Sequence, residues 1–134
     1  MKKIKKSSAV LGLSLALLGI GGVAQASYTF SSFNLTVPKI NGSAYTAYQT
    51  MASDTSGEEF DVIVDSVGGG YKVDLRVNYS DGRNSSWVRD VSSGYSKTLT
   101  SYYPAEKGTK TRLQFSNDLT TYVDVQVKGK WRNN

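Results

Sequence analysis

The sequence predicts an all-β protein: a single antiparallel β-sandwich of about seven or eight strands that follows an N-terminal signal peptide. Apolar and polar residues alternate with a period of two through most of the chain, which is typical of strands with one buried face. Glycine, asparagine and proline residues interrupt these runs at intervals of roughly 10 to 13 residues. No segment has the period of an amphipathic helix. A small β-barrel is the alternative, because the number of strands does not separate the two architectures.

Residues 1–26 have the three parts of a secretory signal peptide. Four lysines lie within the first six residues, an uncharged and mostly apolar run extends from Ala9 to Val23, and Ala24-Gln25-Ala26 is a small-x-small cleavage site. A retained membrane anchor is the alternative, but the run contains four glycines and is shorter than the roughly 20 apolar residues of a spanning helix. We therefore expect a secreted, extracellular domain of residues 27–134 with no stable membrane span after cleavage.

The first strand is predicted from Tyr28 to Val37. Pro38 ends it, because proline has no N–H to donate to a strand ladder. The inward-facing parity changes between Phe30 and Phe33, which predicts a bulge at Ser31-Ser32.

Alternation becomes regular in the middle of the chain. A strand rich in threonine and tyrosine, with weaker patterning, is expected over Ala44–Ala52. Phe60 then opens a strand in which apolar residues alternate with aspartates, and the strand Tyr71–Tyr79 has all its apolar residues, both end tyrosines included, on one face. Gly68-Gly69-Gly70 lies between these two strands and not before a helix, so we expect a hairpin turn there and no phosphate-binding loop.

The second half of the chain supplies the remaining strands. Asp81-Gly82 is a strong hairpin signal, and the mixed faces of Ser85–Val91 predict an edge or bulged strand after it. A further strand is expected over Tyr95–Tyr103, and Leu113 and Phe115 face inward in the next one. The last strand has an inward face made of Val123, Val125, Val127, Gly129 and Trp131.

Charge and composition restrict the function. Four of the 16 basic residues and none of the 11 acidic ones lie in the signal segment, so residues 27–134 carry 12 basic and 11 acidic side chains, a net charge of +1. A nucleic-acid-binding domain would keep a strong positive excess, so we expect no nucleic-acid partner. Cysteine is absent, which excludes a disulfide framework and leaves the fold to core packing.

The chain also has no histidine, which with the missing cysteine removes most nucleophile–base pairs and most zinc or copper sites. We therefore expect no enzyme activity, no catalytic residues, no metal and no cofactor. A small secreted hydrolase, or an inhibitor of one, remains an alternative. The carboxylates of Glu58, Glu59 and Asp61 would serve the hydrolase, and Ser101–Ala105 would form the inhibitory loop.

Aromatic residues are the one unusual excess. All 15 of them (nine Tyr, four Phe and two Trp) fall in residues 27–134. Those that follow the inward parity are expected in the core: Phe33, Phe60, Tyr71, Tyr79, Phe115 and Trp131. Others do not fit the core, and exposed Tyr and Trp are typical of binding surfaces because they give large contact areas at low entropy cost. The candidate binding residues are Tyr45, Tyr48, Trp87, Tyr102 and Tyr103.

Two segments carry a resemblance to a known group: Phe33–Pro38 with Asn41–Tyr45, and the closing Val127–Trp131. They resemble small secreted Gram-positive bacterial proteins of unknown function that are loosely associated with bacteriocin genes. The resemblance implies an antimicrobial or competition role and assigns no functional residue. This chain ends Arg132-Asn133-Asn134 and lacks the acidic tail expected of that group after the tryptophan.

The sequence thus favours a secreted, non-enzymatic protein that binds an unidentified extracellular partner, either a cell-surface glycan or a protein. A bacteriocin-like secreted antimicrobial is the main alternative. The near-neutral charge of residues 27–134 disfavours a simple cationic membrane disruptor, which would need a basic amphipathic element.

Overall fold

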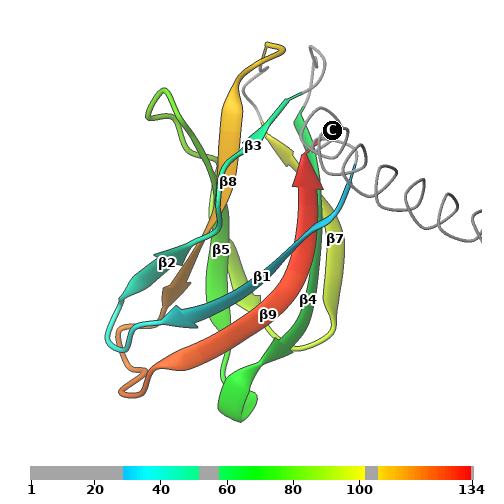
Figure 1. Cartoon of the computed structure of the whole chain (residues 1–134). Coiled ribbons are helices and arrows are strands. Elements are labelled where there is room, and N and C mark those ends of the chain that lie inside the picture. Colours follow the sequence, from blue (N-terminus) through cyan, green and yellow to red (C-terminus); the bar gives the residue numbers. More distant parts are fainter. Residues whose placement is uncertain (1–28, 52–57, 102–105, 134) are drawn as a thin grey trace, which may run out of the picture.

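The computed structural model describes residues 29–51, 58–101 and 106–133. These residues form two antiparallel sheets that pack face to face as a β-sandwich, not a closed barrel (Figure 1). The first sheet has the order β1-β9-β4-β7, and the second has the order β2-β8-β5-β6 with β3 also paired to β8. The strands are β1 (Ser31–Val37), β2 (Ser43–Tyr45), β3 (Gln49–Thr50), β4 (Glu58–Val67), β5 (Val73–Tyr79), β6 (Val88–Val91), β7 (Tyr95–Ser101), β8 (Lys110–Asn117) and β9 (Val125–Asn133).

The predicted fold class is confirmed, with differences in single strands. The strand expected over Ala44–Ala52 is two short strands, β2 and β3, which both pair with β8. Of the segment Ser85–Val91, only Val88–Val91 is a strand: it forms β6, an edge strand with an irregular register against β5, as the mixed faces of the segment indicated. β1 ends at Val37, directly before Pro38.

The core lies between the sheets and is built from the inward parity of each strand. Phe60, Leu113 and Phe115 have no exposed surface, and Trp131 is 1% exposed. Two aromatic pairs join the sheets: Phe33 of β1 packs on Phe115 of β8 with ring centres 5.2 Å apart, and Phe60 of β4 meets the edge of Tyr79 of β5 at 6.3 Å. Burying each such side chain contributes about 1.5–3 kcal/mol to folding, so in a fold without disulfides the packing of this core is the main source of stability.

Of the two hairpins expected at glycine-containing turns, one is present and the other is a connection between the sheets. Gly68-Gly69-Gly70 forms a 3-10 turn, η1, that carries the chain from β4 in the first sheet to β5 in the second, so the predicted hairpin is wrong. Gly69 and Gly70 have φ of 65° and 71°, conformations that glycine adopts without strain. β5 and β6 do pair as a hairpin, with Gly82 at φ 95° in its turn, as Asp81-Gly82 predicted.

Two predicted orientations and one predicted bulge are wrong, each at the end of a strand. Tyr71 is 40% exposed and Val123 is 43% exposed, because β5 begins only at Val73 and β9 only at Val125. The bulge expected at Ser31-Ser32 is absent, since β1 pairs with β9 in unbroken register from residue 31 to residue 37. Phe30 precedes the strand and lies over the guanidinium of Arg132, which explains the change in parity.

Candidate binding site

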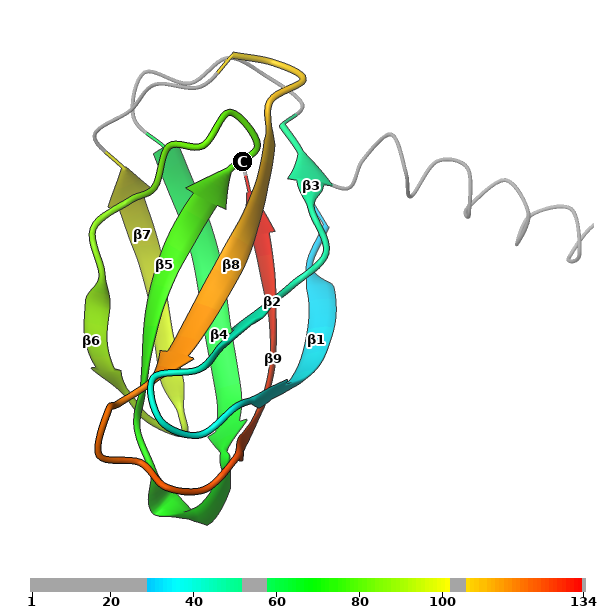
Figure 2. The same cartoon turned by 90° about the vertical axis from the view of Figure 1, so that its left-hand side faces the viewer.

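The outer face of the second sheet carries the candidate site. This sheet faces the reader in Figure 2, with β6, β5, β8 and then β2 and β3 from left to right. On β5, Arg76 and Asn78 alternate with core residues, and on β8 Arg112 and Gln114 do the same. The register places Arg76 opposite Gln114 and Asn78 opposite Arg112.

These four residues occupy the corners of a square on the sheet, and three hydrogen bonds join its two guanidiniums and two amides in a row. Nε of Arg76 donates to Oε1 of Gln114 at 2.7 Å, and Nδ2 of Asn78 donates to the same oxygen at 2.9 Å. Nε of Arg112 lies 3.4 Å from Oδ1 of Asn78. Although they lie on the outer face, Asn78 and Gln114 are only 7% and 6% exposed. The amides therefore fix both arginines in position from below.

Aromatic rings fix the same two arginines from the sides. The guanidinium carbon of Arg112 lies 4.1 Å from the ring centre of Tyr45 and 4.8 Å from that of Tyr48. On the other side of the square, the guanidinium of Arg76 lies 4.4 Å from the ring centre of Trp87. Such cation–π contacts restrain the plane of each guanidinium.

A shallow hollow of about 280 Å³ opens above part of this square. Its polar wall continues into the β5–β6 hairpin, where Asn84 accepts a 2.6 Å hydrogen bond from Asn78. The residues that line it are Tyr45, Tyr48, Arg76, Asn78, Tyr79, Ser80, Gly82, Asn84, Arg112 and Gln114.

Carboxylates near the hollow already have arginine partners. Asp74, buried on the same sheet, accepts a 2.5 Å bond from Arg89, and Asp81 pairs with Arg83 at 2.8 Å. Bonding to the backbone N–H of Arg83 is the main reason that the pKa of Asp81 lies below its ordinary value. Within the described ranges, Arg76 has no carboxylate partner and neither does Arg112. The site is therefore electropositive.

The structure brings together three of the five predicted binding residues. Tyr45 ends β2, Tyr48 lies between β2 and β3, and Trp87 immediately precedes β6; all three lie at the arginines of the square. Tyr102 and Tyr103 lie outside the described residues. Their role in binding stays a prediction.

Sequence reasoning missed the arginines and amides themselves. Arg76 and Asn78 were visible on the polar parity of the strand Tyr71–Tyr79, but such a face is normally solvated. Their partners Arg112 and Gln114 are more than 30 residues away, and only the pairing of β5 with β8 makes them neighbours. The signal available in the sequence was an arginine on the polar parity of each of two predicted strands.

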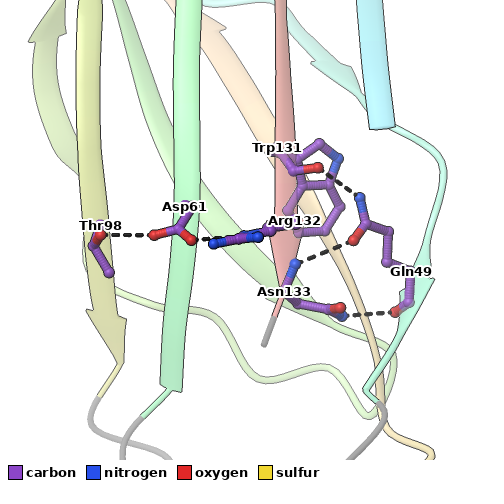
Figure 3. A network of polar contacts seen from close by, with 6 residues as sticks. All are labelled: Gln49, Asp61, Thr98, Trp131, Arg132 and Asn133. Atoms are coloured by element: carbon purple, nitrogen blue, oxygen red, sulfur yellow. Dashed lines mark hydrogen bonds and ion pairs between the residues drawn. The ribbon is translucent and has the colours of Figure 1, made fainter. Parts of the chain in front are cut away.

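The outer face of the first sheet has a different arrangement. Asp61 of β4 accepts hydrogen bonds from Arg132 of β9 at 2.8 Å and from Thr98 of β7 at 2.7 Å (Figure 3). Asp61 is thus engaged in an ion pair, and the side chains of Glu58 and Glu59 lie outside the described residues. Across residues 29–51, 58–101 and 106–133, no three acidic side chains are grouped so that they could hold a metal ion.

No protein-family model matches the chain, and no curated protein is significantly similar to it in sequence. The geometry of the second sheet is consequently the basis for the functional argument.

In the part of the chain that the structure describes, no helix is long and apolar enough to cross a membrane.

Proposed function

We propose that this is a secreted, non-enzymatic binding protein whose working surface is the hollow on the outer face of the second sheet. One observation carries the proposal: two guanidiniums that line one hollow are each hydrogen-bonded to a buried amide and each lie over an aromatic ring. Side chains fixed before binding lose little conformational entropy when a ligand arrives, which is how binding surfaces gain affinity. Side chains that serve only solubility need no such support.

The expected partner is extracellular and polar. Amide, hydroxyl and guanidinium groups line most of the hollow, with the tyrosine rings at its rim. The centre of a stable protein–protein interface is usually more apolar and depleted of charge. A cell-surface glycan therefore suits this surface better than a protein.

A binding assay with paired variants tests the proposal. The secreted protein, recovered from culture medium, is applied to isolated bacterial cell walls and to an immobilised panel of neutral and acidic polysaccharides. We expect Tyr48→Ala to weaken binding to the retained polysaccharide about tenfold. The reason is that the substitution removes one of the two tyrosine rings that hold the guanidinium of Arg112 in place.

The matched control is Thr98→Ala on the exposed outer face of the first sheet. This variant should bind like the unmodified protein. Equal binding by both variants, with both shown to be folded by circular dichroism, would place the working surface elsewhere and overturn the proposal.

A further inference from the structure

We infer that the hollow binds an acidic carbohydrate, a sugar or polyol chain whose carboxylate or phosphate oxygens lie against Arg76 and Arg112. This inference rests on the proposed function and specifies its ligand. It is based on the guanidiniums of Arg76 and Arg112, each of which has unused N–H donors and no carboxylate partner among the described residues.

Each guanidinium has donors left over. Arginine has five N–H donors, and in both arginines the Nε donor faces an amide oxygen of the square. Hydrogen bonds from the terminal Nη donors of Arg76 and Arg112 to any described residue are absent. These donors form the planar fork that matches the two oxygens of a carboxylate or phosphate.

Charge also points to an anion. Arg76 lies opposite Gln114, and Arg112 is two residues from Gln114 on the same strand, so the two arginines are diagonal neighbours on one face. Residues related in this way lie roughly 7–8 Å apart, with their Cβ atoms somewhat closer. Neither positive charge has a counter-ion among the described residues, and a bound oxyanion would supply one.

The aromatic residues act here mainly as supports. Arg112 lies over the rings of both Tyr45 and Tyr48, and Trp87 contacts Arg76 and, at 5.6 Å, Arg89. These rings direct the arginines toward the hollow instead of leaving them free to move in solvent. The hydroxyl and amide groups around them, such as Ser80 and Asn84, suit a ligand rich in hydroxyl groups.

Titration of the secreted protein with defined probes tests the inference. The carboxylate probe is a galacturonic acid oligomer, its neutral control is the methyl ester of the same oligomer, and the phosphate probe is poly(glycerol phosphate). We expect at least one anionic probe to bind more tightly than the methyl ester, with an affinity that falls as salt is added. Which anionic probe binds distinguishes the carboxylate from the phosphate source.

The variants are chosen so that charge alone cannot explain the result. Arg76→Gln combined with Arg112→Gln should weaken binding of the anionic probe by about 10- to 100-fold, as expected for lost charge-assisted hydrogen bonds. Arg112→Lys keeps the charge but loses the planar fork and should also weaken binding. Arg132→Gln removes one positive charge from the opposite face and should leave binding unchanged.

Failure of this inference can be told from failure of the proposed function. If the methyl ester binds as tightly as both anionic probes, or if Arg132→Gln weakens binding as much as the double variant, the anion site is overturned. Should Tyr48→Ala still weaken binding of a neutral glycan in that case, the binding surface stands without the anion. If no probe binds and no variant of this face changes retention on cell walls, both are overturned.

Discussion

Gln49 and Asn133 join the two sheets through two hydrogen bonds, both of which Asn133 donates. The backbone N–H of Asn133 donates to the side-chain oxygen of Gln49, and the side-chain amide of Asn133 donates to the backbone carbonyl of Gln49, each at 3.1 Å (Figure 3). The side chain of Gln49 also donates to the carbonyl of Trp131 at 3.0 Å. β3 belongs to the second sheet and β9 to the first, so this contact closes one side of the sandwich.

Gln49→Ala should lower the free energy of unfolding by about 2–3 kcal/mol, because it leaves buried backbone groups of β9 without partners. Gln49 is 5% exposed and Asn133 is fully buried, so water cannot replace the lost bonds without rearrangement. Gln126→Ala is the matched control, since the exposed side chain of Gln126 bonds, among the described residues, only to the side chain of Asn34 on the neighbouring strand. Chemical denaturation of both variants measures the difference, and equal stabilities would contradict this role for Gln49.

Gly129→Ala should destabilise the protein by roughly 3 kcal/mol or more, because the core there has no room for a methyl group. A Cβ at residue 129 would lie 2.0 Å from the carbonyl oxygen of Ile63 and 2.8 Å from the ring of Phe33. β4 bulges between Val64 and Ser66, next to this close approach. Gly68→Ala is the control: its Cβ would meet nothing closer than 3.5 Å, and the variant should unfold at nearly the normal denaturant concentration.

Ile40→Asn should raise the free energy of unfolding by about 0.5–1 kcal/mol. Ile40 has φ 56°, a left-handed conformation that is strained for a β-branched residue and tolerated by asparagine. Its side chain is 48% exposed, so little apolar burial is lost. Ile40→Val keeps the branch at Cβ and should bring no gain. Thermal unfolding of the two variants separates them, and an increase for valine as large as for asparagine would show that strain is not the cause.

The carboxyl group of Asp81 should titrate with a pKa below its ordinary value, mainly because it accepts a hydrogen bond from the backbone N–H of Arg83. Since the pKa is lowered in the folded state, the carboxylate stabilises the β5–β6 turn at neutral pH, and this contribution is lost as the pH falls through the folded pKa. Arg83→Ala removes the side-chain ion pair but keeps the N–H of residue 83, the largest cause of the shift. Carboxyl NMR titration should therefore show a smaller shift of the same sign in the variant; a return to the ordinary value would assign the effect to the guanidinium instead.

Local alternation determined much of the fold. Successive side chains of a strand point to opposite faces, so the burial of Phe60, Leu113 and Phe115 could be predicted without knowing any strand pairing. The edge position of β6 was also predictable, because a strand with mixed faces fits poorly between two neighbours. The same rule failed at Tyr71 and Val123, where the chain leaves the strand and its parity no longer fixes a direction.

Asn41 and Gly42 lie in the turn between β1 and β2, and each has a different role in it. The positive φ angles of this turn lie at Ile40 and Asn41, whereas Gly42 is needed because a Cβ there would come within 2.5 Å of Pro38. Composition indicates a turn, but which residue carries the unusual conformation depends on how β1 is joined to β2 across the sandwich.

What the sequence by itself determined is the set of strands and the face that each one buries, because both follow from the geometry of neighbouring residues. Tertiary structure alone decided which strands pair, and with that the candidate site. Arg76 reaches Gln114, and Arg112 reaches Tyr45 and Tyr48, only because β8 lies between β2 and β5 in the second sheet. A period of two gives each side chain its face but not its neighbour across the sheet, since that neighbour is set by contacts between segments far apart in the chain.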